Sequence, residues 1–77
     1  MIELDNNHFA EVYTNAIVFY LGNDRIAVVR DFREAGHGWV CMDVVNGYSI
    51  LEMEAVARHV CKMKEYKQII TTPEVTK

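Results

Sequence analysis

The chain has 77 residues, of which 51% are hydrophobic and 25% charged, and its 11 acidic and 8 basic side chains give a formal net charge of -3. This length accommodates one domain spanning residues 1–77, and the apolar fraction excludes an intrinsically disordered chain. The acidic balance argues against a dedicated binder of the nucleic-acid backbone, because such proteins are usually basic.

Location is indicated by the N-terminal residues, the hydropathy pattern and the cysteines. Glu3 and Asp5 stand where a secretory signal would carry basic residues, and no apolar region follows them. The longest uncharged apolar stretch, residues 12–23, is too short to span a bilayer. We therefore expect a cytoplasmic protein without a membrane partner, in which Cys41 and Cys61 are reduced, small and buried.

The first elements in chain order are an ambiguous segment and then a hairpin. Residues 5–15 fit the apolar spacing of a helix and also contain the β-branched residues typical of a strand, and we favour a short helix or irregular turn. The β-rich runs 16–21 and 26–29 predict two strands joined by a turn at 22–24. A third strand is predicted over 39–45.

The strongest local pattern predicts a helix over about 50–66. Ser49 and Glu52 form a capping box at its start, and apolar residues then recur at three- and four-residue spacing. Glu54 and Arg58, four residues apart, are expected to pair on its solvent side.

The C-terminal residues complete the predicted fold. Residues 68–72 predict a short final strand that Pro73 ends, and residues 73–77 are expected to form a frayed tail. The predicted fold class is therefore α+β. It consists of a small antiparallel sheet, made of a three-stranded meander plus the short C-terminal strand, with one principal helix packed on one face.

Alternation along the third strand predicts which side chains face the helix. Val40, Met42 and Val44 form an apolar row that should meet the helix, so Trp39 and Cys41 should point away from it. An exposed tryptophan rimmed by charge is typical of an interface, where aromatic and arginine side chains dominate the binding energy. The predicted partner-binding residues on this second face are Tyr20, Val29, Asp31, Arg33, His37, Trp39 and Asp43.

Potential metal ligands occur in two short pairs, His37 with Cys41 and His59 with Cys61. The first pair would lie about 13 Å apart along a strand, and the second would point about 200° apart around a helix, so neither can chelate zinc. Cys41 could act as a nucleophile with a distant histidine, but no basic cluster or helix N-terminus is evident to form its thiolate. Paired carboxylates lack a cleft in so small a domain. We therefore predict no metal, no cofactor and no enzymatic activity.

These features predict a non-enzymatic protein–protein interaction module. A short acidic domain with dense apolar patterning and no catalytic signature resembles the small accessory proteins of phages and mobile elements. That resemblance implies an inhibitor that occupies the surface of a host or defence protein. A homodimer is a further expectation, because so small a core gains stability when a second face is buried. The alternative is a small RNA- or single-stranded-DNA-binding domain that uses the open sheet face with Lys62 and Lys64.

Overall fold

The computed structural model describes residues 1–71 and shows a five-stranded antiparallel sheet with two helices, which confirms the α+β class. In chain order the elements are β1 (Ile2–Glu3), β2 (His8–Tyr13), β3 (Ala16–Leu21), β4 (Asp24–Phe32), the 3₁₀ turn η1 (Arg33–Ala35), β5 (Gly38–Val44), α1 (Ile50–Val60) and α2 (Lys64–Thr71). Within this part of the chain, no helix is both long and apolar enough to cross a membrane. The predicted frayed tail, 73–77, lies outside the described residues.

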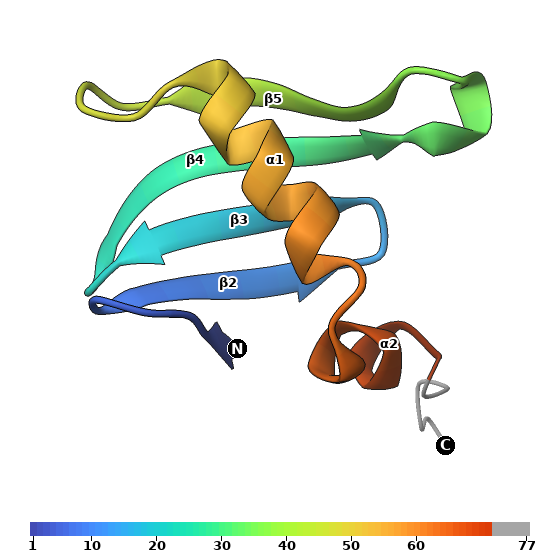
Figure 1. The fold of residues 1–77 in the computed structure, drawn as a ribbon, viewed down its shortest axis with the longest axis horizontal. Coiled ribbons are helices and arrows are strands. Elements are labelled where there is room, and N and C mark those ends of the chain that lie inside the picture. The colour runs from blue at the N-terminus through green and yellow to red at the C-terminus, as the bar shows by residue number, and fades with distance from the viewer. Residues whose placement is uncertain (72–77) are drawn as a thin grey trace.

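The sheet is a meander in which each strand pairs with its neighbours in the sequence, in the order β1-β2-β3-β4-β5. Figure 1 shows α1 crossing one face of this sheet, with α2 following it near the end of β2. The turn from β3 to β4 depends on Gly22, whose φ of +60° lies in the left-handed region. A Cβ there would also come within 3.1 Å of the side-chain nitrogen of Asn7, so glycine is the residue that fits without strain.

The inner face of the sheet, which α1 crosses, forms the hydrophobic core. The register aligns Ile17 of β3 with Val29 of β4 and Cys41 of β5, and all three are buried. Burial of each large apolar side chain contributes roughly 1.5–3 kcal/mol, so this layer is the main source of stability. The buried helix residues that complete it are Met53, Ala57 and Val60 of α1 and Tyr66 of α2.

Helix α1 begins where the capping box predicts. The Ser49 hydroxyl accepts a hydrogen bond of 3.0 Å from the backbone N–H of Glu52, which satisfies one of the free amides in the first turn. The predicted apolar stripe is also confirmed, since Met53, Ala57 and Val60 are the buried residues of the helix.

The end of the predicted helix and the predicted final strand are both wrong. Helix α1 ends at Val60 and, after a short turn, α2 begins at Lys64. Of the predicted strand over 68–72, the described residues are helical. The turn brings Tyr66 against Trp39, with ring centroids 6.3 Å apart, and this burial outweighs the β propensity of the short apolar run that follows.

The ambiguous segment 5–15 contains a strand rather than the favoured helix or turn. Its residues His8–Tyr13 form β2, which lies between β1 and β3 and pairs with both. Ala10 at its centre is fully buried. The strand is favoured here because its backbone forms hydrogen bonds with a neighbouring strand on each side. The local spacing of apolar residues does not reveal these two partners.

The predicted orientation of the third strand is wrong. Trp39 and Cys41 point toward the helices and are only 5% and 9% exposed, whereas Met42, expected to face the helix, is 54% exposed. The register between β4 and β5 shifts once, which leaves Met42 as the extra residue of a bulge and ends the strict alternation there. Val44, beyond the bulge, packs against the core as predicted, while Val40 lies on the opposite face.

Helix α1 is tied to the bulged strand by Glu54. Its carboxylate accepts a hydrogen bond of 2.9 Å from the backbone N–H of Cys41. Within the described residues it forms no ion pair with Arg58, so the predicted helix-surface pair is wrong. A helix carboxylate that satisfies a strand amide fixes the position of α1 over β5, because a partly buried donor left without an acceptor would be costly.

Candidate functional site

The outer face of the sheet lies opposite the helices and, within residues 1–71, no helix covers it (Figure 1). Register and alternation place a set of aromatic and aliphatic side chains on this face, and all of them are at least partly exposed. Single exposed apolar residues are common, but a contiguous group across four strands is typical of an interaction surface. The apolar members of this outer sheet face are Phe9, Tyr13, Val18, Tyr20, Val28, Phe32 and Val40.

Two charged side chains on the outer sheet face contact aromatic residues of the same face. Tyr20 donates a hydrogen bond of 3.0 Å from its hydroxyl to the Glu11 carboxylate, and this bond raises the pKa of Tyr20 above its ordinary value. The Arg30 guanidinium lies 5.2 Å from the centre of the Phe32 ring, within the range of a cation–π contact. The phenol therefore stays protonated at neutral pH.

Four of the predicted partner-binding residues divide between this face and the core. Tyr20 lies on the outer sheet face, as does Asp43, whose carboxylate is 3.5 Å from the Arg25 guanidinium. Val29 and Trp39 are core residues, 0% and 5% exposed, so the prediction that they present a surface anchor is wrong. The structure therefore does not bring these residues together as one patch.

The other predicted residues lie at the end of the sheet where β4 passes to β5. Arg33 donates two hydrogen bonds, of 2.9 and 2.8 Å, to the Asp31 carboxylate, which hold the pKa of Asp31 below its ordinary value. Its guanidinium also lies 4.8 Å from the Trp39 ring centre and 3.5 Å from the Tyr66 hydroxyl. Through these contacts Arg33 covers the edge of the core beside Trp39 and Tyr66. His37 is exposed in the loop before β5.

The surroundings of the two cysteines bear on the nucleophile and metal hypotheses. Cys41 and Cys61 are both free thiols, and burial raises the pKa of Cys41. A nucleophilic cysteine needs a lowered pKa, so the surroundings of Cys41 oppose that role. Among the described residues, no three histidine, cysteine or carboxylate side chains come together in a way that could hold a metal ion.

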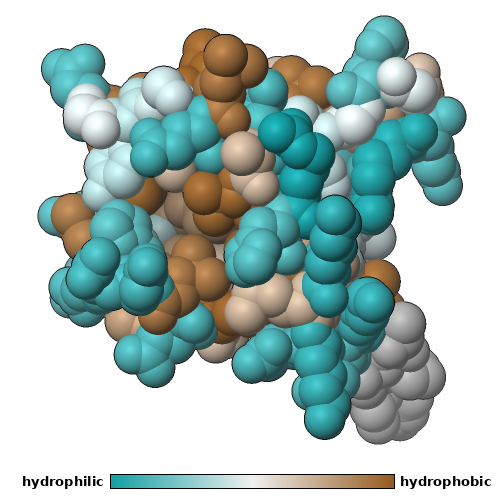
Figure 2. Space-filling model, in the orientation of Figure 1, coloured by the Kyte–Doolittle hydropathy of each residue, from teal (hydrophilic) through white to brown (hydrophobic). Residues whose placement is uncertain are grey.

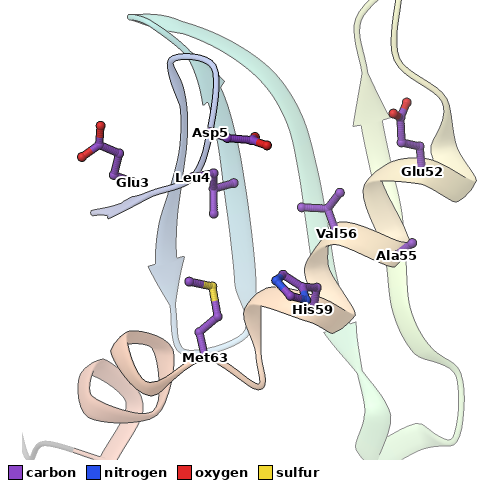
Figure 3. A pocket seen from close by; sticks show the side chains of 8 residues that line it. All are labelled: Glu3, Leu4, Asp5, Glu52, Ala55, Val56, His59 and Met63. Atoms are coloured by element: carbon purple, nitrogen blue, oxygen red, sulfur yellow. The ribbon is translucent and has the colours of Figure 1, made fainter.

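A groove opens on the helix-bearing side, between α1 and the segment that joins β1 to β2. Figure 2 shows an apolar hollow on this side, flanked by polar side chains. In Figure 3, Leu4 on one side and Val56 and His59 on the other point toward the space between them, and Met63 lies at one end. The groove has a volume of about 540 Å³ and is lined by Glu3, Leu4, Asp5, Glu52, Ala55, Val56, His59 and Met63.

Comparison with known proteins adds no family to these surfaces. No protein-family model, curated protein or solved structure matches this chain.

The sequence prediction missed the outer sheet face because it assigned the wrong side of β4 to the core. One signal was available in that strand. Arg30 lies between Val28 and Phe32 in the same alternating row, and a charged residue in mid-strand is rarely buried. Glu11 carries the same signal in β2 once that segment is recognised as a strand.

Proposed function

We propose that this protein is a non-enzymatic protein–protein interaction module that binds through its outer sheet face, and that a second copy of the chain occupies this face. The observation that supports the proposal is the difference between the two sides of the sheet. Both helices pack on one side, and the partly exposed apolar side chains lie on the other. An antiparallel sheet with one solvated face usually carries polar residues there, so this composition is typical of a face that becomes covered.

The size of the outer sheet face suits a weak dimer. Four strands about 4.8 Å apart, with about six residues each at roughly 3.3 Å per residue, span roughly 20 by 20 Å. Side-chain relief raises the accessible area above this flat area, so two copies would bury about 1,000 Å², close to the lower limit for a specific interface. We therefore expect a dissociation constant in the micromolar range, which corresponds to about -8 kcal/mol.

The charges on the outer sheet face favour a second copy over a polyanion. Arg25 and Arg30 share this face with the carboxylates of Glu3, Glu11 and Asp43, and Arg25 already lies 3.5 Å from Asp43. A second copy therefore meets a surface of mixed sign. A nucleic acid would meet the three carboxylates as well as the two arginines, which weakens phosphate binding.

Sedimentation velocity on matched variants tests this proposal. Val18 lies in the middle of β3 on the outer sheet face, whereas Leu51 is 76% exposed on α1. Val18→Glu should abolish the dimer, because the interface would then bury a carboxylate without a partner. Leu51→Glu adds the same charge on the other side and should leave the dimer intact.

Circular dichroism on both variants shows whether they are folded. If Val18→Glu does not fold, Tyr13→Glu provides the same test at a position that is 48% exposed. A wild-type protein that is monomeric at about 100 μM, well above the expected dissociation constant, would contradict the proposal. So would equal weakening of the dimer by Val18→Glu and Leu51→Glu.

A small RNA- or single-stranded-DNA-binding domain is the second candidate. Stacking of bases on aromatic side chains of an open sheet is a common mode of recognition. Fluorescence anisotropy with a labelled oligouridine tests it, and binding that falls steeply with salt would favour this candidate over the dimer. The predicted contributors Lys62 and Lys64 lie at the turn between the helices, on the other side of the sheet. The aromatic residues that favour this candidate are Phe9, Tyr13, Tyr20 and Phe32.

We place the protein in the cytosol in this proposal. Its support is that Cys41 and Cys61 are both free, and thiols stay reduced in that compartment. Inhibition of a host or defence protein stays a prediction, and identification of a bound partner from the source cell would test it.

A further inference from the structure

The groove lies on the helix side of the sheet, so the proposed dimer would leave it open (Figures 2 and 3). We propose that this groove is a second binding site, which takes a short cationic segment of a partner protein with one aliphatic or aromatic side chain as its anchor. The groove would thus bind a different kind of partner from the one that covers the outer sheet face.

The floor of the groove is apolar and held in place by the core. Leu4, Val56 and Met63 are half-buried, and each packs against the core while part of its surface faces the groove. A volume of about 540 Å³ is within the range of sites that enclose a small ligand or a few side chains. An aliphatic or aromatic side chain placed here would leave water for an apolar surface, and the flexible thioether of Met63 can adapt to its shape.

The rim of the groove is acidic. Asp5 stands on the β1–β2 side and Glu52 on the α1 side, whereas the side chain of Glu3 points away from the groove (Figure 3). No lysine or arginine is among the described residues that line the groove, and none of these three carboxylates forms an ion pair within residues 1–71. An anionic ligand would therefore be repelled, whereas lysine or arginine side chains on either side of an apolar anchor would complement the rim.

The shape of the groove suits a peptide segment. It lies between an extended segment on one side and α1 on the other, and the hollow is open on the face drawn in Figure 2 (Figures 2 and 3). Short amphipathic segments bind in grooves of this kind, with apolar side chains inward and charged side chains at the rim. His59 projects into the space from the last turn of α1 and offers a ring nitrogen to a backbone group of the segment.

Titration of the ¹⁵N-labelled full-length protein with a synthetic peptide tests the proposal. The probe is an acetylated and amidated peptide that alternates lysine with leucine around one tryptophan. We expect saturable binding, with amide shift changes confined to residues 3–5 and 52–63. A peptide with glutamate in place of every lysine should not bind. Equal binding of the acidic peptide, no binding of the basic one, or shift changes centred on the outer sheet face would overturn the proposal.

Matched charge variants separate a local site from general attraction. Asp5→Asn combined with Glu52→Gln should weaken peptide binding roughly fivefold, since two exposed ion pairs are lost. Asp24→Asn combined with Glu34→Gln removes the same charge from exposed positions outside the groove and should change the affinity by less than about twofold. Equal weakening by the two double variants would overturn the proposal.

A third variant blocks the groove without altering the core. Ala55 is exposed on the groove side of α1, and lysine is a good helix former, so Ala55→Lys should fold normally. Its cation would occupy the place of the peptide's own lysine and abolish binding. Retained binding by a folded Ala55→Lys protein would overturn the site. Sedimentation of the same variant should still show the dimer, so a failure of the groove proposal is distinguishable from a failure of the proposed function.

Discussion

Replacement of Trp39 tests whether the helix side of β5 belongs to the core. The indole is 5% exposed, lies 4.8 Å from the Arg33 guanidinium and meets the Tyr66 ring edge-on. Truncation of a buried tryptophan to alanine costs about 3–5 kcal/mol. A domain of this length is stable by roughly 4–12 kcal/mol. We therefore expect Trp39→Ala to lose much of its stability, and to unfold if the wild type lies at the lower end of that range.

Trp39→Phe gives a sharper test of the same site. The indole N–H is buried and has no acceptor among residues 1–71, a situation that costs about 1–3 kcal/mol. Phenylalanine removes this donor and keeps a ring against Arg33 and Tyr66. The smaller ring forfeits about 40 Å² of burial, or about 1 kcal/mol. Because the two effects oppose each other, Trp39→Phe should stay within about 2 kcal/mol of the wild type.

Urea unfolding followed by far-ultraviolet circular dichroism measures both variants, since the protein has one tryptophan and fluorescence is lost with it. Leu51→Ala, at a position of α1 that is 76% exposed and outside the outer sheet face, is the surface control and should cost less than about 1 kcal/mol. If Trp39→Ala is no less stable than Leu51→Ala, Trp39 is not a core residue and the two faces of the sheet are reversed.

Two further predictions concern contacts that hold α1 and the end of the sheet. Glu54→Ala should lower the free energy of unfolding by about 1–2 kcal/mol, because the N–H of Cys41 loses its acceptor; an unchanged urea midpoint would contradict this. Hydrogen bonds from Arg33 hold the pKa of Asp31 below its ordinary value of 3.8. The stability that these bonds contribute is therefore present above pH 3.8, and it is lost as the pH falls through the lower pKa of the folded state. Asp31→Asn should therefore be less stable at neutral pH and approach the wild type in acid, and thermal melts that stay equally far apart at every pH would refute it.

Features that depend on neighbouring residues were predictable from the sequence. The start of α1 was predicted because Ser49 and Glu52 form their hydrogen bond within one helical turn. The buried stripe of α1 was predicted because apolar spacing alone determines which side of a helix meets the core. The position of Glu54 was not predictable in this way, since its partner is a backbone amide on a distant strand.

Features that depend on contacts between distant residues were not predictable. A single extra residue, Met42, changes which side of β5 faces the core, and no local propensity marks a bulge there. The run 68–72 has strand propensity, but the packing of Tyr66 against Trp39 favours a helix for its described residues. The outer sheet face could have been found from Arg30, because a mid-strand arginine marks the solvent side of its row.

Isotope-filtered NMR on a dimer mixed from labelled and unlabelled copies tests most directly whether the outer sheet face is the interface. The experiment detects only nuclear Overhauser effects between copies. We predict such effects from the methyl groups of Val18 and Val28 to aromatic protons of Phe9 and Phe32. A dimer whose intermolecular effects involve instead the helix-side residue Leu51, with none to Val18 or Val28, would contradict the proposed interface.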